Sequence, residues 1–205
     1  MKLLQAAACS LGLAALLAAP AQAAHSPANP GDCAPAGVMS KPFSPFGDAG
    51  LYTPVENGGL ENGSASWALA GGATVGSGNE PWFVGGAGHS KSLNLPGGAT
   101  ATTSSICIDE TYTHFRVFAR NTGAAGGQLK IEVLYFDTKG KLLSTKPFAH
   151  KNPTTAWVPS ASVPIEIFGK HTTTTVAPVA FRFSVSGRDA AFQLDDVYVD
   201  PWARS

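Results

Sequence analysis

Hydrophobic and polar positions alternate along several segments in the second half of the chain. In residues 114–120, every second residue from Phe115 is apolar, and the residues between are mostly polar or charged. Residues 128–136 repeat the pattern, with apolar residues alternating with Lys130 and Glu132. Because successive side chains of a β-strand point to opposite faces of a sheet, this period of two predicts strands with one buried face.

Further short runs of the same kind bring the number of expected strands to at least seven. The predicted strands are residues 66–75, 90–95, 106–108, 114–120, 128–136, 142–143, 179–185 and 192–199. Paired glycines such as Gly71-Gly72 mark turns, and no stretch shows the 3.6-residue apolar period of a helix. Short strands joined by glycine-rich turns predict an all-β fold, either an antiparallel sandwich or a barrel.

The first 23 residues have the pattern of a cleavable secretory signal. Lys2 supplies a positive start, an apolar run follows, Pro20 breaks it, and residues 21–23 (Ala-Gln-Ala) fit the small-x-small cleavage pattern. A membrane anchor and a lipoprotein signal at Cys9 are the alternatives. However, the run is short for a span of about 20 residues, and Cys9 lies inside it rather than after it. We therefore expect residues 1–23 to be removed, which leaves a secreted protein without a membrane span.

Two regions follow the predicted signal. Residues 24–50 are rich in Pro, Ala and Gly and show no periodicity, which predicts an irregular N-terminal arm held down by Phe43 and Phe46. Residues 51–205 contain all the predicted strands and are expected to form one β-sandwich domain. Without the signal the chain keeps 182 of its 205 residues, enough to bury a substantial core.

The charges of the chain are balanced. It has 14 Lys and Arg against 14 Asp and Glu, and removal of the signal takes away only Lys2. The basic residues form no block or stripe. We therefore expect neither nucleic acid nor an anionic membrane surface as a partner.

Two cysteines, Cys33 and Cys107, remain once the signal with Cys9 is removed. In an oxidising compartment a single pair has only one intramolecular connectivity, which predicts a Cys33–Cys107 disulfide. The bond would close a loop of roughly 75 residues and tie the arm to the sandwich, a constraint worth about 4–5 kcal/mol of stability.

The last predicted strand, residues 192–199, contains two adjacent carboxylates, Asp195 and Asp196, in a run that is otherwise mostly apolar. An unpaired carboxylate in a sheet core is very costly, so both must meet a cation, a network of hydrogen-bond donors or water. Far upstream, residues 56–63 read Glu-Asn-Gly-Gly-Leu-Glu-Asn-Gly and are followed by Trp67.

Residues 56–67 and residues 192–199 resemble the two ends of the galactose-binding-like jelly-roll superfamily, which includes many carbohydrate-binding modules. The Ser-x-Ser-Leu-x-Leu segment that begins at Ser90 adds to this resemblance. The resemblance covers roughly residues 51–200, although Leu60 stands where members usually have Phe. Residues 78–81 and 118–123 also resemble a family of uncharacterised secreted bacterial proteins. The resemblance implies an antiparallel jelly-roll β-sandwich, a superfold that hosts binding, adhesive and purely structural domains.

Many modules of this superfamily hold a structural calcium ion between the opening Glu and the closing Asp. Carried over to this chain, the motif points to Glu61 with Asp196 or Asp195, together with backbone carbonyls. Calcium takes six to eight oxygen ligands and accepts carbonyls among them. The alternative is that the two aspartates cap turns or pair with Arg182 or Arg188.

Sugar recognition needs exposed aromatic rings, on which the C–H faces of sugars stack, beside polar groups that bond to hydroxyls. The candidate ligand-binding residues are Trp82, Phe83, His89, Tyr112, Tyr135 and Trp157. Trp82 follows a proline in a segment expected to be a loop, whereas Trp67 lies in a regular strand and favours the core. For each of the other aromatic residues, a place in the core competes with a role in ligand binding.

Familiar catalytic motifs are absent from the sequence. It has no Gly-x-Ser-x-Gly, no His-Glu-x-x-His and no phosphate-binding loop, and its five histidines lack metal-ligand spacing. The pair Asp109-Glu110 could serve glycoside hydrolysis, but it fits a solvated turn better. We expect a secreted, non-catalytic domain that binds a polysaccharide or surface glycan. The alternatives are a structural or adhesive extracellular protein without a small ligand, and a small glycan-active hydrolase or lyase.

Overall fold

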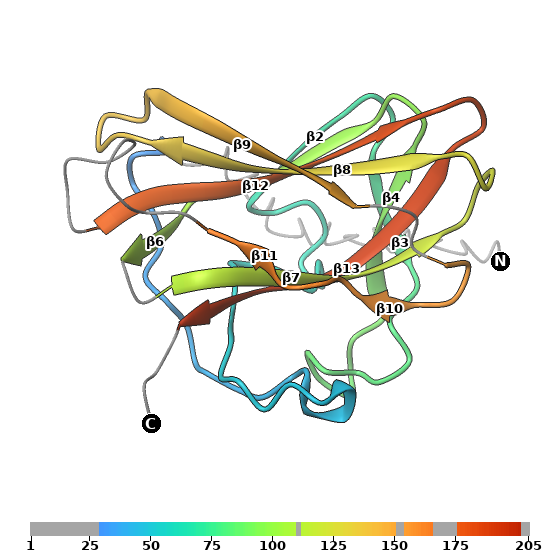
Figure 1. Ribbon diagram of the computed structural model, residues 1–205, viewed down its shortest axis with the longest axis horizontal. Coiled ribbons are helices and arrows are strands. Elements are labelled where there is room, and N and C mark those ends of the chain that lie inside the picture. The colour runs from blue at the N-terminus through green and yellow to red at the C-terminus, as the bar shows by residue number, and fades with distance from the viewer. Residues whose placement is uncertain (1–28, 110–111, 151–153, 166–175, 202–205) are drawn as a thin grey trace, which may run out of the picture.

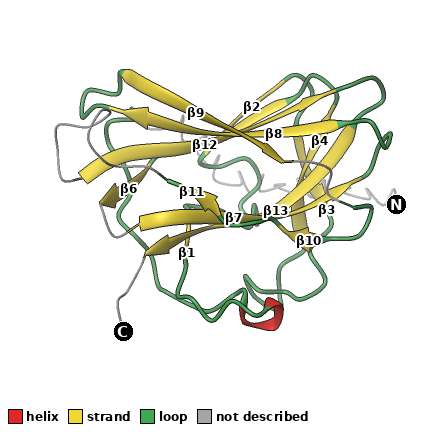
Figure 2. Ribbon diagram, in the orientation of Figure 1, coloured by secondary structure: helices red, strands yellow, loops and turns green. Residues whose placement is uncertain are grey.

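The computed structural model describes residues 29–109, 112–150, 154–165 and 176–201. In these ranges the chain is mostly β-structure, and two antiparallel sheets pack face to face as a jelly-roll β-sandwich (Figures 1 and 2). The predicted signal, residues 1–23, lies outside the described residues. Among the residues that are described, no helix is long and apolar enough to cross a membrane.

The first sheet contains the candidate site. Its strands in the described chain are β1 (Thr53–Pro54), β3 (Thr74–Ser77), β4 (Lys91–Pro96), β7 (Tyr112–Asn121), β10 (Val158–Pro159), β11 (Val163–Pro164) and β13 (Ala191–Pro201). The strand order is β10–β7–β13–β4–β3, with β1 paired to β13 and β11 paired to β7. The long strands β7 and β13 therefore form the centre of this sheet.

The second sheet covers the opposite side of the core. Its strands in the described chain are β2 (Trp67–Ala70), β5 (Thr100–Thr103), β6 (Ile106–Asp109), β8 (Gln128–Phe136), β9 (Leu142–His150) and β12 (Val176–Ser186). The order is β2–β5–β12–β8–β9, with β6 paired to β12. The short 3-10 helix η1 (Ser44–Phe46) belongs to the arm and lies outside both sheets (Figure 2).

The core between the sheets is built from the alternating positions that the sequence predicts. Phe115 and Val117 of β7 point inward, as do Phe181 and Phe183 of β12, and all four side chains are fully buried. The rings of Phe115 and Phe181 lie 4.2 Å apart, so the two sheets touch directly. Such burial of large apolar side chains is the main stabilising contribution to the fold.

One predicted strand is wrong, because residues 66–75 form two strands. Gly71 and Gly72 adopt the left-handed conformation, with φ of 65° and 87°, and turn the chain from β2 in the second sheet to β3 in the first. Strand β5, residues 100–103, was not among the predicted strands. Its Thr-Ala-Thr-Thr sequence has little hydrophobic contrast, although Ala101 and Thr103 are buried.

The part of the arm around Phe43 packs against the outer face of the first sheet, on the side away from the core, whereas Gly31 and Ala34 lie beside the second sheet (Figure 1). Phe43 of the arm is fully buried, and its ring stacks on that of Phe118 of β7 at 5.4 Å. Asp48 of the arm forms an ion pair with Arg116, 2.8 Å between Oδ2 and Nη1, and the Arg116 guanidinium lies 4.3 Å above the Phe43 ring. The arm thus covers part of this face.

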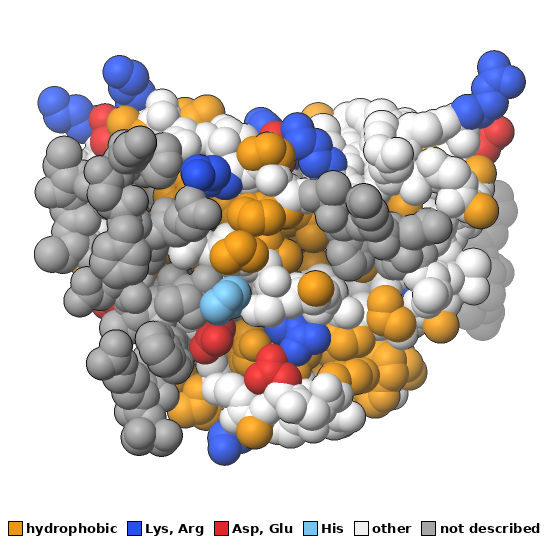
Figure 3. Space-filling model, in the orientation of Figure 1, with side chains coloured by type: hydrophobic (Ala, Val, Ile, Leu, Met, Phe, Trp, Pro, Cys, Tyr) orange, Lys and Arg blue, Asp and Glu red, His pale blue; other side chains and the backbone are white. Residues whose placement is uncertain are grey.

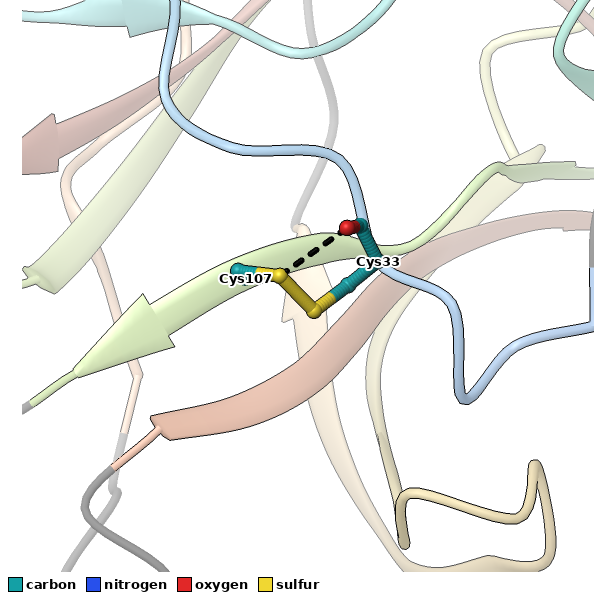
Figure 4. Close-up of a disulfide and its surroundings, with 2 residues drawn as sticks. All are labelled: Cys33 and Cys107. Carbon is teal, nitrogen blue, oxygen red and sulfur yellow. Dashed lines mark hydrogen bonds between the residues drawn. A yellow bond between two sulfur atoms is a disulfide. The ribbon is translucent and has the colours of Figure 1, made fainter.

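A disulfide joins Cys33 of the arm to Cys107 of β6, which confirms the predicted pairing (Figure 4). The two Cα atoms are 4.9 Å apart, and the residues are 74 positions apart in sequence. The Cys107 sulfur also lies 3.0 Å from the carbonyl oxygen of Cys33. The disulfide is consistent with a protein that works in an oxidising, extracellular environment.

Candidate functional site

A line of polar side chains crosses the part of the outer face beside the region that the arm covers. Arg120 of β7 is paired with Gln193 of β13, Gln193 with Asn94 of β4, and Asn94 with Thr74 of β3. Directly paired residues of neighbouring strands point to the same face. We call Arg120, Gln193, Asn94 and Thr74 the polar row; the first three are half-buried and Thr74 is exposed.

Hydrogen bonds connect three members of the polar row. Nε of Arg120 donates to Oε1 of Gln193, and Nε2 of Gln193 donates to Oδ1 of Asn94, both at 2.6 Å. These bonds fix the orientation of the two amide groups. They leave the terminal guanidinium nitrogens of Arg120 and the amide nitrogen of Asn94 without a hydrogen-bond partner in the described structure, so those donors are available to a ligand.

Gly76 makes room for the row beside Asn94. An added Cβ at Gly76 would lie 2.6 Å from the amide nitrogen of Asn94, closer than real Cβ contacts come. The absence of a side chain at this position lets the Asn94 amide lie over the β3 backbone.

Trp157 stands at the other end of the polar row, just before β10. The guanidinium carbon of Arg120 lies 5.0 Å from the centre of the Trp157 ring, a cation–π distance. Only 9% of Trp157 is exposed. Its ring therefore supports Arg120 and offers little surface on which a sugar could stack.

The 78–90 loop, between β3 and β4, presents two exposed aromatic rings. Trp82 is 41% exposed and Phe83 is 47% exposed. The Trp82 ring lies 5.6 Å from Phe118, which precedes Arg120 by two residues and shares its face of β7. Hydrophobic side chains gather in Figure 3 at the lower right, where β10 and the 78–90 loop lie in Figure 1. Trp82 thus stands beside the polar row.

Glu80 fixes the loop that carries Trp82. Its side chain is fully buried, and its two carboxyl oxygens accept hydrogen bonds from the backbone N–H groups of Trp82 and Val84, each at 2.5 Å. The backbone N–H of Glu80 in turn donates to Oδ2 of Asp195 at 3.0 Å. A buried side chain and a central strand therefore hold the position of Trp82.

Glu80, Asp195 and Asp196 form a cluster of buried carboxyl groups beneath the loop. Asp195 is fully buried and Asp196 is 2% exposed. Burial and the adjacent Asp196 raise the pKa of Asp195, and burial together with Glu80 raises the pKa of Asp196. Backbone N–H groups donate hydrogen bonds to both carboxyl oxygens of Asp195. Oδ1 accepts from the N–H of Asp196 at 2.9 Å, and Oδ2 accepts from the N–H of Glu80.

A β-bulge in β13 turns the Asp196 side chain toward the loop. Asp196 adopts a left-handed φ of 50°, and the register with β7 shifts between Asp195 and Tyr198. Oδ1 of Asp196 lies 3.8 Å from Nδ1 of His89. Among the described residues, none forms a hydrogen bond with Oδ2 of Asp196. A buried, orphaned carboxyl oxygen of this kind could meet a cation.

The predicted calcium ligands fit such an ion only in part. Oδ2 of Asp196 is unbonded in the described part of the chain, whereas both oxygens of Asp195 already accept backbone bonds. Oε1 of Glu61 accepts from the N–H groups of Ser90 and Lys91, each at 2.8 Å. No group of three or more His, Cys, Asp or Glu among the described residues is arranged to hold a metal ion. Backbone carbonyls would have to supply most of the ligands.

The predicted ligand-binding aromatics do not form one group. Trp82 and Phe83 lie together on the exposed loop, His89 lies half-buried beside Asp196, and Trp157 supports Arg120. The ring of Tyr135 is fully buried in the core, out of reach of a ligand. The backbone of Tyr112 lies in β7, but its side chain is outside the described structure.

The polar residues of the site were not among the predicted ones. Arg120, Gln193 and Asn94 each occupy the solvent side of an alternating strand, and the sequence gives no indication of which strands are neighbours. Glu80 lies in a loop without periodicity, so nothing predicts its burial. The alternative ion pair of Asp195 or Asp196 with Arg182 is not formed, because Arg182 pairs with Glu132 on the second sheet.

No protein-family model matches the sequence, and no curated protein matches it either. Among solved structures, the fold is similar to that of the enzymatically active domain of tailspike protein 4 from bacteriophage CBA120. The TM-score is 0.53 at 16% sequence identity, over 72% of this chain and 21% of the tailspike chain. This chain thus spans about a fifth of the tailspike, and the similarity shows the fold alone.

Two carbohydrate-binding modules are more distant. The CBM22-1 xylan-binding domain of Xyn10C from Paenibacillus barcinonensis has a TM-score of 0.46 and 16% identity, over 69% of this chain and 89% of its own. The family 11 module of cellulase Lic26A-Cel5E from Clostridium thermocellum has a TM-score of 0.44 and 10% identity, over 66% and 88%. At TM-scores below 0.5, these similarities carry no argument about the function of this chain.

Proposed function

We propose that this protein is a secreted, non-catalytic domain that binds carbohydrate at the polar row. The observation that carries the proposal is the hydrogen-bonded line Arg120–Gln193–Asn94 beside the exposed ring of Trp82. A sugar presents apolar C–H faces and a rim of hydroxyl groups. Fixed amide and guanidinium donors next to an exposed aromatic ring are complementary to both features.

The size of the row suits a short stretch of polysaccharide. Four neighbouring strands carry it, and strands lie about 4.8 Å apart, so the row extends for about 14 Å. Hydrogen bonds hold three of its side chains, Arg120, Gln193 and Asn94, in place. A ligand would therefore meet donors that are already ordered, which lowers the entropic cost of binding.

The carboxyl groups near the row support binding rather than catalysis. Glycoside hydrolysis needs two carboxyl groups that face the scissile bond from opposite sides. Glu80 and Asp195 are fully buried, and all four of their carboxyl oxygens accept backbone hydrogen bonds. In this arrangement they shape the loop and are not presented to a substrate.

We also propose that a calcium ion binds near Asp196 and Glu61, with backbone carbonyls as its further ligands. The orphaned Oδ2 of Asp196 supports this, as does the close approach of several buried carboxyl groups, whose repulsion a cation would relieve. The ion would stabilise the junction of β13 with the 78–90 loop.

A structural or adhesive role is the second candidate. It is favoured by the arm, which fills part of the outer face of the first sheet and is fastened by the Cys33–Cys107 disulfide and the Asp48–Arg116 ion pair. In that case the sandwich would serve as a durable extracellular module, and the polar row would only stabilise the sheet.

Retention of the exported protein on a panel of insoluble polysaccharides distinguishes the two functions. Saturable retention on one or more of them supports carbohydrate binding. Absence of retention across a broad panel, with and without calcium, rejects it in favour of the structural or adhesive role.

A further inference from the structure

Three half-buried arginines on the sheet faces have different partners. Arg116 pairs with Asp48 and Arg182 pairs with Glu132, each at 2.8 Å. Among the described residues, Arg120 meets no carboxylate; its one hydrogen bond goes to the neutral amide of Gln193, and its guanidinium carbon lies over the Trp157 ring. Described carboxylates therefore neutralise Arg116 and Arg182, and none of them neutralises Arg120.

The guanidinium of Arg120 is nevertheless held in a fixed position. The bond from Nε to Gln193 measures 2.6 Å, and the Trp157 ring supports the group at 5.0 Å. Gln193 is in turn held by Asn94. Since Nε is already used, the terminal nitrogens remain as a planar pair of donors, a geometry that matches the two oxygens of a carboxylate.

The rest of the polar row adds no negative charge. Gln193, Asn94 and Thr74 are neutral. Asp195, two residues along β13, is fully buried and directs both carboxyl oxygens to backbone N–H groups, so it does not serve Arg120 as a counter-ion. A ligand at the row thus meets one oriented positive charge among neutral donors and acceptors.

We propose that Arg120 binds a carboxylate of the glycan, so that the site prefers polysaccharides built from uronic acids to neutral ones. This inference rests on the proposed carbohydrate-binding function and names the class of sugar. The terminal nitrogens of Arg120 donate to the sugar carboxylate. Asn94 and Thr74 bond to hydroxyl groups further along the chain, and the exposed Trp82 ring stacks on a sugar face.

Calorimetric titration of the exported protein with trigalacturonic acid and with its trimethyl ester tests the proposal, because esterification removes the three negative charges and adds only one methyl group at each carboxyl. A charge-assisted hydrogen bond predicts that the acid binds at least about tenfold more tightly than the ester. In R120Q the acid and the ester should bind equally. R188Q, at an exposed arginine in the turn before β13, is the matched control and should keep the preference.

Several results would overturn the inference. They are equal binding of both trisaccharides by the unaltered protein, a preference that survives R120Q, or a preference lost equally in R188Q. Binding of the sulfate ester of an uncharged trisaccharide as tight as that of trigalacturonic acid would also overturn it. If R120Q does not fold, R120K keeps the charge but loses the planar pair of donors, and an unchanged preference in R120K overturns the inference. Retention on neutral polysaccharides without any preference rejects this inference alone, whereas no binding to any glycan rejects the proposed function itself.

Discussion

Arg120 and Gln193 lie opposite each other on β7 and β13, and Nε of Arg120 donates a 2.6 Å hydrogen bond to Oε1 of Gln193. The two residues are 73 positions apart in sequence. The pairing of β13 with both β7 and β4 extends this contact to Asn94. A continuous polar row on the outer face of the first sheet is the result, and it carries the proposed function.

Replacement of Trp82 by Ala should abolish retention on polysaccharide. Trp82 is exposed but contacts Phe46 and Phe118 at its base, so the free energy of unfolding should fall only by about 1–2 kcal/mol. Binding assays at a temperature well below the midpoint of unfolding separate the two effects. Phe83→Ala, at a neighbouring exposed ring without a described ring contact, serves for comparison. Undiminished retention by Trp82→Ala would remove this ring from the site.

Chelation of calcium should lower the melting temperature of the exported protein. A bound ion would offset the repulsion among the buried carboxyl groups of Glu80, Asp195 and Asp196, and a chelator would restore that repulsion. Asp196→Asn should remove the difference between melts with calcium and with chelator. Identical melts of the unaltered protein under both conditions would contradict the calcium proposal.

The ion pairs of Glu132 should stabilise the folded protein at neutral pH, and this contribution should be lost in acid. Hydrogen bonds from Arg182, with a further contribution from Lys130, hold the pKa of Glu132 below its ordinary value despite its burial. A carboxyl group whose pKa is lower in the folded state contributes stability that is fully present above the unfolded value of 4.5 and lost as the pH falls through the folded value.

Chemical denaturation of Glu132→Gln and of the unaltered protein at pH 7 and pH 3 measures this contribution. The variant should be less stable at pH 7, and the gap should narrow at pH 3. A gap that stays constant or widens in acid would show that the ion pairs of Glu132 do not cause the effect.

Loss of the disulfide should destabilise the fold and loosen the arm. The bond closes a loop of 74 residues, so a double Cys33→Ala, Cys107→Ala variant should lose about 4 kcal/mol of its free energy of unfolding. Reduction of the unaltered protein should give a similar loss. Protease cleavage within residues 29–50 should become faster in both cases, and equal stability and equal cleavage would show that other contacts suffice to hold the arm.

The fold follows from the sequence to a large extent, because an alternating strand with a buried face is a strong local signal. Residues 128–136 and 179–185 show that signal, and both lie in the long central strands β8 and β12. The signal fails where the contrast between faces is weak, as in Thr100–Thr103. The disulfide was predictable because two cysteines allow a single pair.

The candidate site was much less predictable, since it depends on which strands are neighbours. Arg120, Gln193 and Asn94 each occupy an ordinary solvent-facing position, and only the register of three strands aligns them. Tyr135 was predicted to bind a ligand, but its ring is buried in the core, where the alternation of its strand already places it. Glu80 gives no signal at all, because its burial depends on the path of a loop around β13.

Gln193→Leu is the sharpest test of whether the polar row binds carbohydrate. Leucine at this position removes both hydrogen bonds of the row with little change in volume. Thr102→Val, at a half-buried position on the outer face of the second sheet, is the control. On a polysaccharide that retains the unaltered protein, we expect at least about tenfold weaker retention of Gln193→Leu and unchanged retention of Thr102→Val. Equal retention of both variants, or no retention of the unaltered protein on any polysaccharide, would contradict carbohydrate binding at the row.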